Sequence, residues 1–145
     1  MTKNRFLYIP VLIAVFFLSS CSAMCKNPVL KNTKWTANQD MFVADAGTMK
    51  IVHTLEFISD KDVKVLQKGE MPPYPAMYVN EDGTIDTMPG HSFEYNYDGT
   101  YVFSKGKLTI TSKEGAEHEY TLQPDGTLTY EEPWGETLVF TKVKE

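Results

Sequence analysis

Apolar and polar residues alternate with a period of two through most of the segment 50–143. From Phe93 to Tyr97 every second residue is aromatic, and a similar spacing recurs over 107–111 and 119–123. Successive side chains of a β-strand point to opposite faces, so this period gives each strand one apolar and one polar face. Such strands are typical of an antiparallel sheet that buries one face and exposes the other to water.

Turn sequences separate these segments. Asp-Gly-Thr occurs three times, at 82–84, 98–100 and 125–127, and Lys105-Gly106 and Glu114-Gly115 are two further turn candidates. Asp-Gly favours tight hairpin turns because glycine readily adopts positive φ. We therefore expect about eight to ten short strands joined mostly by hairpins. Eleven segments have strand character, and one or two of them are expected to be too short to form strands: 33–37, 50–59, 62–68, 76–79, 84–88, 91–97, 100–104, 107–112, 116–122, 127–131 and 137–143.

A long meander with one apolar face has to cover that face. Closure into a barrel covers it and removes the sheet edges at the same time. The sequence therefore predicts an all-β fold, an antiparallel up-and-down β-barrel with little helix. The only helix candidate is Gln39–Ala46, with Asn38 as N-cap and Gly47 after its end.

The segment Met71–Pro75 contains three prolines in five residues. Proline has no backbone N–H to donate, so this segment does not fit a central strand. We expect a stiff loop at a rim of the barrel. It is either a plain connector or a lid that presents Tyr74 to a ligand.

The N-terminus has the three parts of an export signal: basic residues at Lys3 and Arg5, an apolar run over 6–18, and two small serines. The run is too short for a transmembrane helix, which needs ~20 apolar residues. Leu18-Ser19-Ser20-Cys21 then resembles the lipobox of bacterial lipoproteins. The resemblance implies removal of residues 1–20 and attachment of lipid to Cys21, with a diacylglycerol and usually an N-acyl chain. Two or more such chains anchor a protein stably to a membrane.

We accordingly expect three parts: a lipoprotein signal peptide at 1–20, a lipidated tether at 21–31 and a barrel domain at 32–145. In the lipoprotein sorting that the lipobox implies, Asp after the lipidated cysteine retains a protein at the inner membrane. Ser22 therefore predicts an outer-membrane lipoprotein that faces the periplasm. Cys25 remains as a single thiol in the tether and is expected to be incidental.

Charge argues against nucleic acid as a partner. Loss of Lys3 and Arg5 leaves 12 of the 14 basic residues against 19 acidic ones, a formal net charge of −7. An acidic surface repels phosphate backbones, and the sequence contains no basic patch.

The start of the predicted barrel, Asn32-Thr33-Lys34-Trp35, is similar to that of lipocalin-like bacterial lipoproteins. The Asp-Gly turns and the last strand, at 138–143, also resemble those of these lipoproteins. The resemblance covers most of residues 30–144. It implies a barrel with a cup-like interior in which Trp35 is a structural plug that closes one end.

A search for catalytic or metal-binding residues gives little. His53, His91 and His118 are each in register with inward-facing residues of their strands. Together they suggest a site for a metal or an anionic ligand, but the three lie on separate strands without local ligand spacing. We favour the alternative that each imidazole ring lies near a strand end and is hydrogen-bonded or exposed to solvent. No nucleophile elbow, phosphate-binding loop or marked carboxylate pair occurs, so we expect no enzymatic activity, no cofactor and no metal.

Aromatic residues are the most numerous candidates for contact with a ligand. The candidates for ligand contact are Phe57, Tyr74, Tyr95 and Tyr120. So many large rings favour a small cavity or a filled interior. We expect a membrane-anchored binding protein for a small apolar or amphipathic ligand. The alternative is a non-enzymatic interaction module or accessory subunit of a cell-envelope complex. In that case Trp134, within a predicted hairpin loop, is an exposed anchor for the partner instead of a core residue.

Overall fold

The computed structural model describes residues 28–76 and 78–144, and within them it contains strands and no helix. Cys21 and the rest of the predicted signal and tether up to residue 27 lie outside the described residues. The strands are β1 (Thr33–Val43), β2 (Gly47–Phe57), β3 (Asp62–Met71), β4 (Tyr74–Pro75), β5 (Thr87–Met88), β6 (His91–Ser104), β7 (Lys107–Ser112), β8 (Glu117–Leu122), β9 (Leu128–Glu131) and β10 (Thr137–Lys142). Within 28–76 and 78–144 no helix is long and apolar enough to cross a membrane.

Eight strands close a barrel in the order β1-β10-β9-β8-β7-β6-β3-β2, and β4 and β5 form a separate two-stranded sheet. Every strand pair is antiparallel. The expected all-β up-and-down barrel is therefore confirmed. The small β4–β5 hairpin is inserted between β3 and β6, which pair directly with each other.

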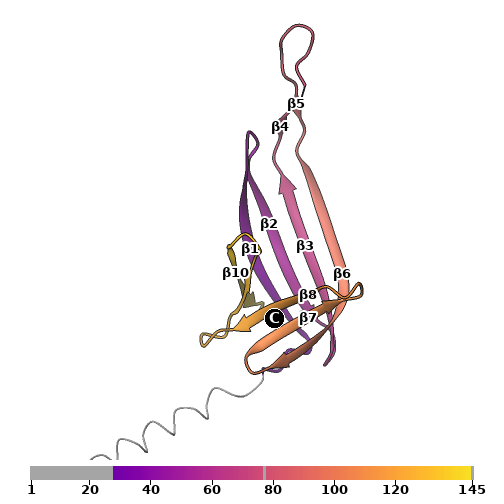
Figure 1. Cartoon of the computed structure of the whole chain (residues 1–145), viewed down its shortest axis with the longest axis vertical. Coiled ribbons are helices and arrows are strands. Elements are labelled where there is room, and N and C mark those ends of the chain that lie inside the picture. Colours follow the sequence, from indigo (N-terminus) through magenta and orange to yellow (C-terminus); the bar gives the residue numbers. More distant parts are fainter. Residues whose placement is uncertain (1–27, 77, 145) are drawn as a thin grey trace, which may run out of the picture.

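The strands have unequal lengths, and this shapes the molecule. β1, β2, β3 and β6 have 10 to 14 residues, whereas β7 to β10 have 4 to 6. The long strands rise together beyond the short ones; β1 and β2 end at the turn between them, and β3 and β6 lead into the β4–β5 hairpin (Figure 1). We call the part beyond the short strands the projecting sheet (37–43, 47–53, 67–71 and 91–95). β10 pairs with β1 only at Trp35 and Thr36, and β7 pairs with β6 only from Gly99 onward. Within the described residues, one edge of β1 and one edge of β6 therefore have no partner strand in the projecting sheet.

The expected turn at Asp98-Gly99 is wrong, because β6 runs straight through it. Gly99 is paired on both sides, with Val63 of β3 and Ser112 of β7. A Cβ atom on Gly99 would lie 2.7 Å from the Thr111 carbonyl oxygen. The glycine is thus needed for close approach of two backbones, where β6 passes from the projecting sheet into the closed barrel.

The expected helix at Gln39–Ala46 is also wrong. β1 continues to Val43, with Gln39 buried and Asp40 exposed in strand alternation. The chain then turns with Asp45 at φ 65° and Gly47 at φ 99°. Pairing with β2 along the whole of β1 hydrogen-bonds one edge of the strand here, so tertiary context overrides a local helix signal.

The hairpin between β3 and β6 is less regular than expected. The predicted strands 76–79 and 84–88 are replaced by the two-residue strands β4 and β5. Backbone bonds from Ala76 to Asp86 (2.7 Å) and from Asn80 to Thr84 (2.8 Å) continue the hairpin outward. Its tip is the expected Asp82-Gly83 turn, with Gly83 at φ 81°.

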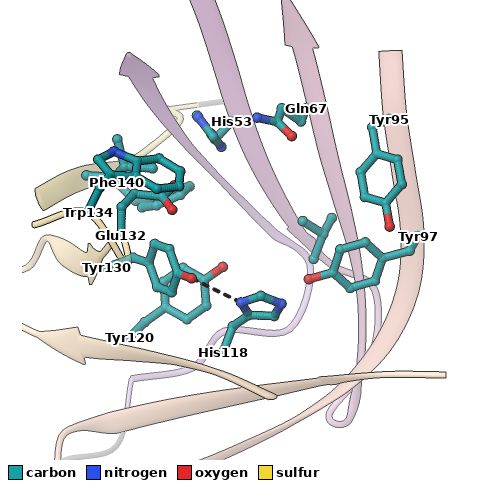
Figure 2. A pocket seen from close by; sticks show the side chains of 12 residues that line it. His53, Gln67, Tyr95, Tyr97, His118, Tyr120, Tyr130, Glu132, Trp134 and Phe140 are labelled. Carbon is teal, nitrogen blue, oxygen red and sulfur yellow. Dashed lines mark hydrogen bonds between the residues drawn. The ribbon is translucent and has the colours of Figure 1, made fainter. Parts of the chain in front are cut away.

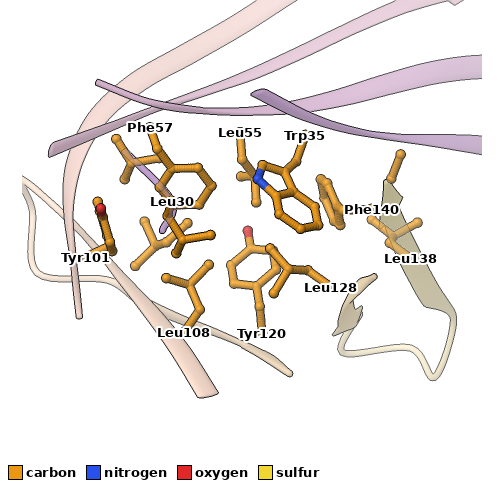
Figure 3. Packing of buried hydrophobic residues seen from close by; sticks show 13 residues of the cluster. Leu30, Trp35, Leu55, Phe57, Tyr101, Leu108, Tyr120, Leu128, Leu138 and Phe140 are labelled. Carbon is orange, nitrogen blue, oxygen red and sulfur yellow. The ribbon is translucent and has the colours of Figure 1, made fainter. Parts of the chain in front are cut away.

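Side chains of the closed barrel fill its interior at the end where residue 28 enters, which we call the closed end (Figure 3). Its buried residues form one cluster: Leu30, Trp35, Ala37, Leu55, Phe57, Val63, Tyr101, Leu108, Ile110, Tyr120, Leu128, Leu138 and Phe140. Trp35 is 4% exposed, and its indole Nε1 donates to Thr33 Oγ1 at 2.9 Å. Full burial of one such apolar side chain contributes about 1.5–3 kcal/mol. The closed end is therefore the main source of stability.

Candidate functional site

Above the closed end the barrel opens into a cavity of about 340 Å³, which we call the mouth cavity (Figure 2). Side chains from β2, β3 and β6 face those from β8, β9 and β10 across it. Its lining consists of His53, Val65, Gln67, Tyr95, Tyr97, His118, Tyr120, Tyr130, Glu132, Trp134, Leu138 and Phe140. Tyr120, Leu138 and Phe140 also belong to the core cluster, so the floor of the cavity is the top of the core.

A histidine–tyrosine pair stands at one side of the mouth cavity. His118 Nδ1 of β8 and Tyr130 Oη of β9 are 3.1 Å apart and share a hydrogen bond. The Tyr130 ring also packs on Tyr120, with ring centroids 4.9 Å apart and planes tilted by 33°. These contacts hold three ring systems in fixed orientation at the cavity wall.

A second polar group joins the projecting sheet to the β9–β10 turn. Gln39 is 3% exposed and donates from Nε2 to Glu136 Oε2 at 2.6 Å, while its Oε1 lies 2.9 Å from His53 Nε2. An amide oxygen only accepts, so His53 Nε2 carries the proton of this bond. A neutral His53 ring then has an unprotonated Nδ1 that can accept a hydrogen bond.

Burial changes the acid–base properties of the cavity. It lowers the pKa of His53, an effect that the charge of Glu136 partly opposes. Burial and then the charge of Glu136 raise the pKa of Glu132. Burial, together with nearby Tyr95, Tyr130 and Glu114, raises the pKa of Tyr97 to about 12. Tyr97 therefore stays neutral and His53 favours its uncharged form near neutral pH.

The rim of the cavity includes the β9–β10 turn, in which Glu132 N–H donates to the Glu136 carbonyl at 2.8 Å and Gly135 adopts φ 93°. This turn holds Trp134 with 62% of its surface exposed. The indole Nε1 donates to Glu136 Oε2 at 3.5 Å. Trp134 thus lies at the cavity entrance and not in the core.

The structure brings together only some of the residues proposed from sequence. Tyr95 and Tyr120 both line the mouth cavity. Phe57 is instead buried in the closed end, and Tyr74 lies in β4 of the separate small sheet. Trp35 is buried in the core at the closed end, where the plug was expected.

The three histidines do not form one site. His53 and His118 line the mouth cavity, as their inward register predicts. His91 is exposed at the start of β6, opposite Met71. Within residues 28–76 and 78–144, no group of three or more His, Cys, Asp or Glu side chains is arranged to hold a metal ion.

Sequence reasoning missed the polar part of the site, which includes Gln39, Gln67 and Glu132. A signal was present: Gln39 follows Trp35 and Ala37 in steps of two, and Glu132 follows Leu128 and Tyr130 in the same way. These steps place polar side chains on the inward face. A polar residue on an apolar face marks a site or a buried network.

Comparisons with protein families, curated proteins and solved structures found no match to this chain. The arrangement offers an apolar floor, ring faces and hydrogen-bond acceptors in one concave space. Such a space is suited to binding a small molecule.

Proposed function

We propose that the protein is a membrane-anchored, non-enzymatic binding protein that holds a small amphipathic molecule in its mouth cavity. The observation that carries the proposal is the open cavity of about 340 Å³, with an apolar floor and a wall of polar aromatic residues. Small-molecule sites are concave spaces of roughly 300–1,000 Å³ that combine apolar walls with a few polar groups. The volume is at the low end of this range, so the ligand is small.

Native mass spectrometry of the full-length protein, purified in non-ionic detergent from the membranes of its own cell, tests this proposal. We expect a small molecule to remain bound. Val65→Trp adds bulk inside the cavity and should release it. Lys64→Trp is the matched control, because its side chain is on the opposite face of β3. A wild-type protein that is always empty would contradict the proposal.

The anchor is a separate part of the proposal and is supported by the Leu18-Ser19-Ser20-Cys21 sequence. Cys21→Ser should shift the protein from the detergent phase to the aqueous phase in a phase-partition assay. Equal partitioning of variant and wild type would exclude lipid on Cys21. Protease treatment of intact cells tests the proposed periplasmic side of the outer membrane, and loss of the domain without lysis would contradict it.

Exposed apolar residues on the β4–β5 hairpin favour a second candidate, a protein-interaction module of a cell-envelope complex. Tyr78, Val79 and Ile85 are each more than half exposed there. Exposed apolar groups that cluster on one element often mark a protein contact. A photo-crosslinking residue at Val79 should then give one discrete adduct in cells. The same residue at Lys113, in the β7–β8 turn, is the control.

A further inference from the structure

The fixed charge of the mouth cavity is negative. Its twelve lining residues include the carboxylate of Glu132 and no lysine or arginine. Glu136 adds a second carboxylate just behind the lining, where Gln39 and Trp134 donate to its Oε2. A bound anion would therefore face repulsion without a compensating cation.

The uncharged polar groups of the mouth cavity also favour a hydrogen-bond donor over an anion. Gln39 fixes the proton of His53 on Nε2, so the Nδ1 atom of the neutral ring accepts hydrogen bonds. The hydroxyl oxygens of Tyr95 and Tyr97 also accept. A donor-rich group finds several acceptors here, whereas a purely apolar molecule would leave them desolvated and unpaired.

Aromatic rings complete the site. Tyr130 and Trp134 lie on the same side of the cavity as Glu132, and Tyr95 and Tyr97 lie opposite (Figure 2). The face of an aromatic ring carries partial negative charge and attracts cations. Tyr130 and Tyr120 are already fixed by mutual packing, so little ordering is required when a ligand binds.

We propose that the mouth cavity selects a small organic ammonium ion whose charged nitrogen lies beside Glu132 and the rings of Tyr130 and Trp134. The apolar part of the ligand contacts the floor at Leu138 and Phe140. This inference depends on the proposed binding function and specifies the chemical class of its ligand. Glu132 is the residue that distinguishes a cation from a neutral molecule of the same shape.

Three probes of similar size test the proposal on the full-length protein in non-ionic detergent: 2-phenylethylammonium, 2-phenylethanol and phenylacetate. Isothermal titration calorimetry measures the affinity of each. We expect the ammonium ion to bind about tenfold more tightly than the alcohol, the effect of one charge-assisted hydrogen bond, and phenylacetate to bind most weakly. This comparison needs no variant and so does not depend on the folding of one.

Glu132→Gln should remove the preference for the ammonium ion and leave affinity for the alcohol nearly unchanged. Glu131→Gln is the matched control, since it removes the same charge from the exposed adjacent position of β9 and should keep the preference. Equal binding of ammonium and alcohol, or tighter binding of phenylacetate, would overturn the ammonium assignment while supporting a binding function. If none of the probes binds, the assignment is wrong, and the mass-spectrometric experiment separately decides whether the cavity has a ligand.

Discussion

The two tryptophans of the described residues lie at opposite ends of one barrel and in opposite environments. Trp35 is enclosed by the core of the closed end, and its indole N–H bonds within its own strand. Trp134 is largely exposed at the rim of the mouth cavity, and its indole N–H reaches Glu136. The same residue type thus stabilises the fold at one end and is available for contact at the other.

The difference extends beyond tryptophan. The closed end contains aliphatic and aromatic side chains in dense contact, with Leu108, Ile110 and Leu128 fully buried. The mouth has histidine, tyrosine and glutamate side chains, each with a polar end directed toward a cavity. Packing is therefore complete at one end and incomplete at the other, which is the arrangement of a rigid base below a binding site.

The largest expected effect comes from Trp35→Ala. Truncation of a buried tryptophan costs about 3–5 kcal/mol, because it removes apolar contacts and leaves a cavity. The melting temperature should therefore fall sharply in a thermal unfolding experiment. An unchanged melting temperature would show that the closed end does not determine stability.

A smaller loss is expected at the junction of the two regions, from Gln39→Ala. This change leaves the Glu136 carboxylate and the His53 N–H without their buried partner, a cost of about 1–3 kcal/mol. Chemical denaturation measures it. Asn38→Ala alters the exposed adjacent position and should have little effect. Equal stability of the two variants would mean that the Gln39 network does not join the projecting sheet to the β9–β10 turn.

The third effect depends on pH. Burial lowers the pKa of folded His53, so below its ordinary pKa of about 6.5 the unfolded chain binds more protons than the folded one at this residue. Stability should therefore fall as pH decreases from neutral through this value, until the folded pKa is passed. His53→Gln should make the thermal stability less dependent on pH in this range. His91→Gln, at the exposed start of β6, is the control and should leave the pH dependence of thermal stability unchanged.

Trp134→Ala has the smallest expected effect on stability. Removal of a largely exposed side chain changes the free energy of unfolding by about 0.5 kcal/mol or less. Ligand retention in native mass spectrometry should nevertheless decrease, because the rim ring is lost. A loss of stability close to that of Trp35→Ala would show that the mouth contributes to the core.

Much of the fold was readable because alternation and turn chemistry are local properties. The barrel class and the inward register of His53 and His118 follow from them. The Asp98-Gly99 error has a specific cause: the same dipeptide supplies a turn at 82–83 and a close backbone approach in β6. The Gln39–Glu136 bond joins residues 97 positions apart, so no local pattern predicts it. The fold class could therefore be predicted from the sequence, whereas the full set of residues that form the site could be identified only from the three-dimensional structure.

The unequal strand lengths have a consequence for amide hydrogen exchange. Val143 N–H donates to the Lys34 carbonyl, so the even-numbered residues of β1 direct their backbone groups toward the β10 side. Beyond Thr36 that side has no partner strand within the described residues. The amides of Asn38, Asp40 and Phe42 should exchange quickly with solvent, while those of Gln39 and Met41, bonded to β2, exchange slowly. The fast and slow positions should alternate along a single strand, and this pattern would mark where closed barrel gives way to open sheet.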